Sequence, residues 1–308
     1  MTAENQNAFF IKLKRNRDLL ACYPHPSFPT ISITGGNCAL SCKHCGRHYL
    51  KKMIPCTAPE ALQEACLRLY SKGVKGVLLS GGYNAEGYLP FESFLDAIER
   101  VKRETGIFIS AHTGLVPEWL AKEIGAAGID LADFDLVGDD DTIKLVTGTD
   151  KTVEDYRQSM KALSRSVKYV VPHICVGLHA GELRGEFRAL EMASEIKPSL
   201  IVLLVLTPTP ETEFEKLTSP SPEDFENVAV AARLRFPKAQ LSLGCVRPRD
   251  SRRLGIELAA LHSGFDRIEL PSGQTLKTAR AMELIIKKIP TCCAVPEEIA
   301  SNFGFLKI

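Results

Sequence analysis

The chain has 308 residues, of which 45% are hydrophobic, and its formal net charge is +1 at pH 7. This length and apolar content suit a single large domain, since α/β barrels of this size need no second one. The balanced charge gives no indication of a nucleic-acid partner. The longest apolar run, residues 200–206, is far shorter than the roughly 20 residues that cross a bilayer, and no signal peptide is recognisable. We therefore expect a cytoplasmic protein with no membrane partner.

Short runs of apolar or β-branched residues alternate with amphipathic segments along most of the chain. In chain order, the expected strands are residues 30–34, 75–79, 107–111, 129–136, 169–176, 200–206, 240–243 and 267–270. The segments between them, such as 58–71, repeat apolar side chains at three- and four-residue spacing, which is typical of helices. Alternating strands and helices predict a parallel sheet with right-handed crossovers.

The simplest closure of eight such units is an α/β fold of the (β/α)8 TIM-type barrel, whose working face is built by the loops after the strands. A partial barrel, open or with six units and two extra elements, is the alternative. We expect the barrel over residues 30–288, with an N-terminal extension at 1–29 and a C-terminal tail at 289–308.

Three cysteines follow the first expected strand. Cys38, Cys42 and Cys45 have the spacing C-x3-C-x2-C, and His44 directly precedes the third. Ten cysteines in a chain without a secretory signal favour metal or redox chemistry over disulfides. Three thiolates on one loop can hold three irons of a 4Fe–4S cubane and leave the fourth iron open to another ligand. A zinc site with His44 or His48 as its fourth ligand is the alternative.

This triad, in the loop after the first strand of a barrel, resembles the signature of the radical S-adenosylmethionine superfamily. The resemblance covers residues 28–270 and implies that the open iron chelates the amine and carboxylate of S-adenosylmethionine. A reduced cluster would then yield a 5′-deoxyadenosyl radical, which abstracts hydrogen from a substrate. It also implies a reductant such as ferredoxin or flavodoxin.

Further motifs carry the same resemblance. It implies a site for S-adenosylmethionine that includes the ring of His44 and residues after the later strands. Gly81 and Gly82 resemble the family's Gly-Gly-Glu element, whose backbone meets the methionyl amine, although Tyr83 stands in place of the glutamate. Glycines suit such a close backbone approach. His112 follows the third expected strand and is also placed to line the pocket.

Other candidates follow the later strands. Related enzymes place a polar ligand for the ribose or methionyl group after strand four, where this chain offers Asp135 or Asp139. Val176 lies in a stretch that resembles the Val-Gly-Leu-Gly-Glu segment of biotin and lipoyl synthases, whose apolar residue packs on the adenine. Residues 206–212 resemble the Pro-x-Pro-Gly-Thr segment of the biotin synthase group, with Glu211 in the place of the glycine.

The remaining cysteines suggest a second iron–sulfur cluster. Its expected ligands are Cys245, after the seventh strand, and the adjacent Cys292 and Cys293 in the tail, with Cys22 as the next candidate. We expect Cys22 and the start of the tail at the bottom of the barrel and Cys245 at the top, so the tail must fold back to join them. Redox-inert thiols are the alternative.

The finest resemblance rests on segments 244–249, 268–272 and 292–294. Together they are most similar to one subunit of the two-component, archaeal-type lipoyl synthase. This implies sulfur insertion into an octanoyl chain on a lysine of a carrier protein, such as a lipoyl domain or a glycine cleavage H-like protein, together with a second radical subunit. The cysteines that hold the second cluster of biotin synthase are missing from the matching strands.

Two other functions stay open. One is a radical mutase or lyase of the methylornithine synthase or hydrogenase-maturase kind, with a single essential cluster and a small amino-acid-like substrate. The other is a metal-binding scaffold that keeps the triad without turnover.

Overall fold

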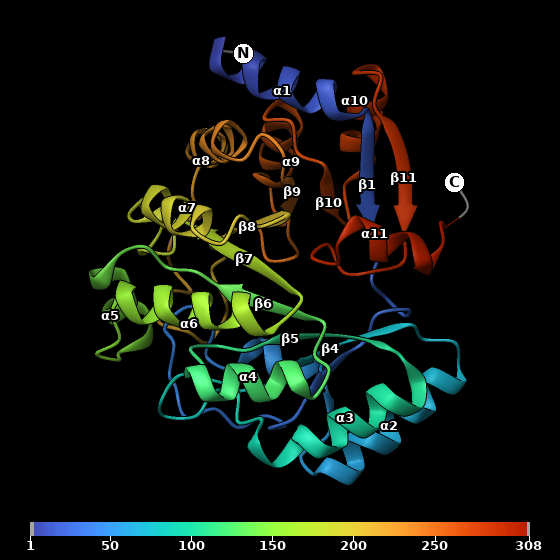
Figure 1. Ribbon diagram of the computed structural model, residues 1–308. Helices are drawn as coiled ribbons and strands as arrows, with labels where there is room; N and C mark the ends of the chain where they lie inside the picture. The colour runs from blue at the N-terminus through green and yellow to red at the C-terminus, as the bar shows by residue number, and fades with distance from the viewer. Residues whose placement is uncertain (1–2, 307–308) are drawn as a thin grey trace.

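The computed structural model describes residues 3–306 and contains one curled, parallel sheet (Figure 1). Its eleven strands follow the order β11-β1-β10-β9-β8-β7-β6-β5-β4-β2-β3. The strands are β1 (Asp18–Cys22), β2 (Thr30–Ser32), β3 (Ile54–Pro55), β4 (Gly76–Ser80), β5 (Phe108–His112), β6 (Leu131–Asp135), β7 (Tyr169–Val176), β8 (Leu200–Val205), β9 (Gln240–Leu243), β10 (Arg267–Glu269) and β11 (Ile285–Ile289). Since β11 and β3 are free edges, the fold is the partial form of the expected barrel.

All eight strands expected from the sequence are present, as β2 and β4–β10. Three further strands lie outside that prediction. The most consequential is β1, which comes from residues 1–29 yet inserts between β10 and β11. The arrows of β1 and β11 run side by side in the same direction in Figure 1. The N-terminal segment is therefore part of the sheet, while the domain limits at residues 30 and 288 stay predictions.

Helices connect the strands and cover the outer face of the sheet (Figure 1). They are α1 (Ala3–Arg15), α2 (Pro59–Ser71), α3 (Leu95–Thr105), α4 (Glu118–Ala126), α5 (Asp140–Thr147), α6 (Val153–Ser166), α7 (Glu186–Ser194), α8 (Pro222–Arg235), α9 (Arg253–His262) and α10 (Gly273–Ala281). The short helix α11 (Glu297–Ala300) follows β11 and packs against the inner face instead. Helix α6 starts with a capping box, in which Thr152 and Asp155 each satisfy the other's backbone N–H group. No helix within residues 3–306 is long and apolar enough to cross a membrane.

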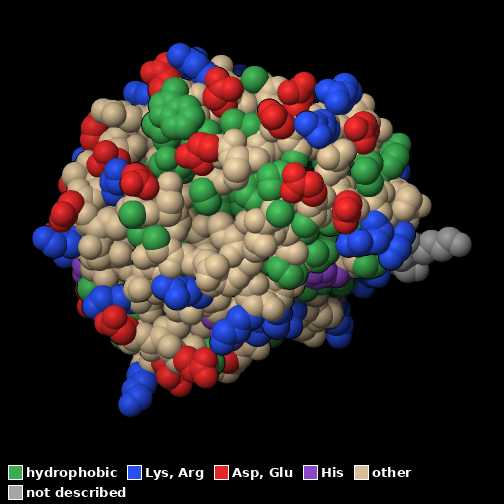
Figure 2. All heavy atoms as spheres, turned by 90° about the horizontal axis from the view of Figure 1, so that it is seen from below, with side chains coloured by type: hydrophobic (Ala, Val, Ile, Leu, Met, Phe, Trp, Pro, Cys, Tyr) green, Lys and Arg blue, Asp and Glu red, His purple; other side chains and the backbone are tan. Residues whose placement is uncertain are grey.

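Charges of both signs are spread over the face at the bottom of Figure 1, with hydrophobic side chains between them (Figure 2). That face consequently presents no large field of one sign. Its appearance agrees with the balanced composition of 38 basic and 37 acidic residues.

Alternation along the strands separates two apolar layers. One packs between the sheet and the helices, and the other fills the inner face of the sheet. The inner layer contains Phe108, Val171 and Val202 from three strands, and also Cys293 and Val295 from the C-terminal tail. The chain after β11 therefore packs against the inner face of the sheet.

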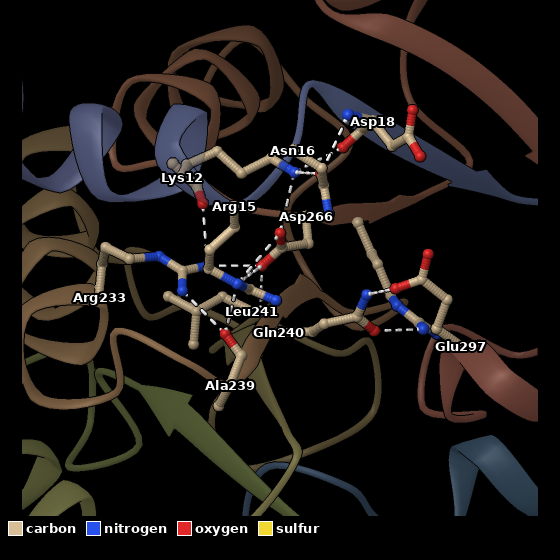
Figure 3. Close-up of polar contacts among 12 residues, drawn as sticks. Lys12, Arg15, Asn16, Asp18, Arg233, Ala239, Gln240, Leu241, Asp266 and Glu297 are labelled. Atoms are coloured by element: carbon tan, nitrogen blue, oxygen red, sulfur yellow. Dashed lines mark hydrogen bonds and ion pairs between the residues drawn. The ribbon is translucent and has the colours of Figure 1, made fainter.

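A buried ion network joins α1 to α8 and to the residue that precedes β10 (Figure 3). Asp266, 1% exposed, lies 2.9 Å from Lys12, 2.5 Å from Arg233 and 3.2 Å from Arg15. Burial alone would raise the pKa of Asp266, but the three cations hold it below its ordinary value. This network anchors α1, and through it the entry of β1, to the elements around β10.

Candidate active site

The triad loop follows β2 and is held by backbone hydrogen bonds from three directions. Ala39 N donates to the carbonyl of Tyr83 after β4 at 2.8 Å. Lys43 N donates to the carbonyl of Val146 in α5 at 2.9 Å, and Lys43 O accepts from Phe214 N at 3.2 Å. The loop is thus fixed by elements far from it in sequence.

Gly82, two residues after the end of β4, lies against this loop. A Cβ atom at Gly82 would lie 2.0 Å from the carbonyl oxygen of Asn37 and 2.4 Å from Cβ of Cys38. The backbone that this glycine approaches therefore belongs to the triad loop itself. Gly81, with φ +153°, is packed against Thr34 and Leu89. The expected contacts of the two glycines with a methionyl group stay predictions.

The three triad thiols are partly exposed, and their environment suits a cluster. Burial raises the pKa of Cys42 to about 12, and the neighbouring Cys45 and Cys38 add to this shift. Burial also raises the pKa of Cys45. Such thiols hold their protons unless a metal cation replaces them, which is what iron does in a thiolate-bound cluster.

The zinc alternative needs four ligands around one ion. Across residues 3–306, no three His, Cys, Asp or Glu side chains gather closely enough to hold a single metal ion. A cubane differs because each thiolate binds a different iron, so the triad fits a cluster better than zinc. His44 adds a buried Nδ1 without a hydrogen-bond partner in the described part of the chain. Burial lowers the pKa of His44, which favours a neutral ring beside the triad.

Asp135 is the last residue of β6, and His112 is the last residue of the neighbouring strand β5. His112 Nδ1 is 3.8 Å from Asp135 Oδ2. Burial would lower the pKa of His112, but its close polar contact with Asp135 and the charges of Asp133 and Asp135 raise it to about 9. Asp135 also acts electrostatically on Cys42 and His44. Asp135 is thus close enough to the triad loop to influence the pKa values of its side chains.

Asp139 and Val176 have other neighbours. Asp139 is the N-cap of α5, accepts a hydrogen bond from Thr142 N at 2.8 Å and pairs with Arg184 at 3.2 Å. Val176 is fully buried in the outer apolar layer. A role for either residue in binding the cofactor stays a prediction.

A buried polar group on the inner face was not selected from the sequence. Ser110 on β5 donates to Asp133 Oδ2 on β6, and His173 Nε2 on β7 lies 3.7 Å from Asp133 Oδ1. The rings of His173 and His112 have centroids 5.7 Å apart. The available signal was the alternation of polar residues along these otherwise apolar strands, as in Ser110 and His112.

The expectation that Cys22 and the start of the tail lie at the bottom of the barrel is wrong, because both lie where strands end at the carboxyl edge of the sheet. Cys22 ends β1 and pairs in register with Glu269 at the end of β10 and Ile289 at the end of β11. Because β1 runs parallel to its neighbours, its last residue reaches the same edge of the sheet as Cys245, which follows β9.

The tail brings two more sulfurs to these cysteines. The adjacent Cys292 side chain interacts with Cys293 and lowers the pKa of the Cys293 thiol. Cys293 in turn acts electrostatically on both Cys22 and Cys245. The residues expected to hold a second cluster therefore lie near one another. Their role as cluster ligands stays a prediction.

A buried arginine supports the Cys245 loop. Arg247, 2% exposed, donates to the carbonyl of Gly244 at 2.6 Å and pairs with Glu257 at 2.9 Å. Arg249 donates to the carbonyl of Cys245 at 3.2 Å and to Glu269 at 2.9 Å. These contacts hold the main chain of this loop, while Cys245 itself stays exposed.

Comparisons with known proteins agree with this geometry. Residues 32–184 match the family model described as Radical SAM superfamily. Biotin synthase of Geotalea daltonii is 23% identical over 233 residues, which are 73% of this chain and 69% of that protein. Methylornithine synthase shares the fold with a TM-score of 0.63 at 15% identity, covering 91% of this chain and 87% of that one. The FeFe-hydrogenase maturase HydG from Carboxydothermus hydrogenoformans gives a TM-score of 0.66 at 12% identity, covering 98% and 74%.

Proposed function

Because this chain belongs to the radical S-adenosylmethionine superfamily, we propose that it uses its cofactor to prepare a substrate for sulfur insertion. Cys38, Cys42 and Cys45 would hold the 4Fe–4S cluster, which supplies the electron that cleaves S-adenosylmethionine. The proposed substrate is an octanoyl chain on a lysine of a carrier protein. The proposed partners are that carrier, a second radical subunit and a ferredoxin or flavodoxin.

The observation that carries this proposal is the position of the tail. Cys293 packs in the same buried cluster as Cys22 and Cys292 on the inner face. It also acts electrostatically on Cys245 and on His112. A sulfur source held by Cys245, Cys292 and Cys293 would therefore lie on the inner face of the sheet, on the side where His112 contacts Asp135, which in turn influences the triad loop. A donor of sulfur needs this proximity, because the activated carbon must be held within contact distance of it.

A radical mutase or lyase acting on a small amino-acid-like substrate is the second candidate. The buried polar group of Ser110, Asp133 and His173 favours it, since such a surface suits a polar substrate better than a hydrocarbon chain. This candidate needs the triad cluster alone, and the tail cysteines would then have a structural role.

Iron counting separates the two candidates. The protein is reconstituted anaerobically as wild type, as a Cys38/Cys42/Cys45 triple Ala variant, and as that variant with Cys245 and Cys292 also changed to Ala. Sulfur insertion predicts about eight irons, about four irons and none, respectively, since each cubane holds four. Cys66→Ala is the control, because Cys66 is buried on α2 away from the site and should leave the iron count unchanged.

A triple Ala variant without iron would refute the second cluster and favour the single-cluster candidate. If about four irons remain, the next assay is sulfur insertion into an octanoyl-lysyl peptide. The formation of 5′-deoxyadenosine without any sulfur-containing product would argue against the proposed substrate.

A further inference from the structure

We propose that Asp133 and His173 form a binding site for an N–H donor group of the substrate, on the inner face of the sheet. This inference rests on the proposed function only in the choice of an octanoyl-lysine peptide as the first ligand tested. An N–H donor occurs both in an acylated lysine, as an amide, and in a small amine, as an ammonium group.

The first argument is an unsatisfied carboxylate oxygen. Asp133 is 2% exposed and Ser110 is 1% exposed. Ser110 satisfies Oδ2 of Asp133, whereas Oδ1 has no hydrogen-bond partner within residues 3–306. Native proteins rarely bury a polar atom without a partner, and such atoms commonly mark a site for a ligand or an ordered water.

The second argument is the tautomer of His173, which is 7% exposed. Its Nδ1 lies 2.9 Å from the carbonyl oxygen of Val171. Because a carbonyl only accepts, Nδ1 must carry the proton, and Nε2 of the neutral ring is then an acceptor. Nε2 faces Asp133 Oδ1 across 3.7 Å, a distance too long for a hydrogen bond. Two acceptors at this separation are complementary to one donor group that lies beside them, within hydrogen-bond distance of both.

The third argument is the location of this pair. Asp133 is opposite His112 in the register of β5 and β6, and the rings of His112 and His173 are 5.7 Å apart. On its other side, Asp133 acts electrostatically on Cys292 and Cys293. A substrate nitrogen bound here would lie between the triad side of the site and the tail cysteines, so the site would set how the chain next to that nitrogen is placed.

The test compares two ligands that differ in one donor. Binding of an Nε-octanoyl-lysine peptide and of its ester isostere, in which oxygen replaces the amide N–H, is measured by calorimetry on the reconstituted enzyme. We expect the wild type to bind the amide about ten-fold more tightly, because the ester leaves the buried acceptors unpaired. Asp133→Asn should lose this preference, since the new amide group can itself donate to His173.

Asp130→Asn is the matched control. Asp130 precedes the same strand and pairs with Lys102 at the outer side, so the preference for the amide should persist. A second readout is the nitrogen chemical shift of the His173 side chain, which should show the neutral Nδ1–H tautomer at pH 7 and change when the amide binds. Equal affinity of the wild type for both peptides, an unchanged preference in Asp133→Asn, or an imidazolium in the free enzyme would overturn the proposal.

A second pair of probes keeps the test independent of the proposed function. If neither octanoyl peptide binds, the octanoyl substrate is refuted, and octylamine is compared with octyltrimethylammonium, which has the same charge but no N–H donor. Tighter binding of octylamine in the wild type, lost in Asp133→Asn, would support the site and assign it to an ammonium group. Equal binding of the two amines would refute the site itself.

Discussion

Gly82→Ala tests how closely β4 must approach the triad loop. The added Cβ atom would lie 2.0 Å from Asn37 O and 2.4 Å from Cβ of Cys38, whereas real Cβ contacts are not shorter than 3.0 Å. The two segments must therefore move apart by about 1 Å, and close-packed interiors do not absorb such a change freely. Both neighbours belong to the triad loop rather than to a flexible side chain, so Cys38 must shift relative to Cys42 and Cys45.

The expected result is a loss of triad iron together with a loss of activity. Overpacking of this kind costs about 1–3 kcal/mol in stability, which leaves a domain of this size folded. A displacement of about 1 Å can lower turnover by about 100-fold. The assays are iron and sulfide content after anaerobic reconstitution, formation of 5′-deoxyadenosine with dithionite, and circular dichroism as a check on folding.

Gly36→Ala is the matched control in the same loop, because no atom lies within 4 Å of its added Cβ. It should keep both iron and cleavage activity. If Gly82→Ala binds iron and forms 5′-deoxyadenosine like the wild type, the close approach of β4 does not position the triad. If both variants lose iron equally, the loop is sensitive to any substitution and the packing argument fails.

Three further predictions concern the triad, a strained loop and the buried ion network. Cys42→Ala should abolish 5′-deoxyadenosine formation, since a cubane with two protein thiolates fails to assemble; cleavage at the wild-type rate would contradict the assigned cluster. Glu211 has φ +64°, so Glu211→Gly should be about 1 kcal/mol more stable than Glu213→Gly, its control, in urea unfolding. Both glutamates are exposed and pair with lysines, and equal stabilities of the two variants would refute the strain. Asp266→Asn should cost about 3–5 kcal/mol at pH 7 by leaving buried cations unpaired. Because the pKa of Asp266 is lowered on folding, its contribution is present above the ordinary carboxyl pKa and is lost as the pH falls through the folded value, so wild type and variant should converge in acid.

Local patterns in the sequence were sufficient for the triad and for most of the sheet. The spacing of Cys38, Cys42 and Cys45 places three thiols on one loop whatever the rest of the chain does. The eight expected strands were found because buried parallel strands form short apolar runs that local composition reveals. A local pattern also explains Glu211. The resembling segment has glycine at this position, and the backbone of Glu211 has the positive φ that glycine adopts most easily.

The tertiary structure decided what those patterns leave open, namely which distant segments lie together. Residues 18–22 have no local mark of their partners, yet they insert between β10 and β11 and carry Cys22 to the edge where Cys245 lies. The tail packs against the sheet because its apolar residues fill the inner face of an open sheet, which is a property of the assembled fold. The facing acceptors of Asp133 and His173 likewise depend on the register of neighbouring strands, which is set by pairing between residues far apart in the chain and not by the sequence around either one.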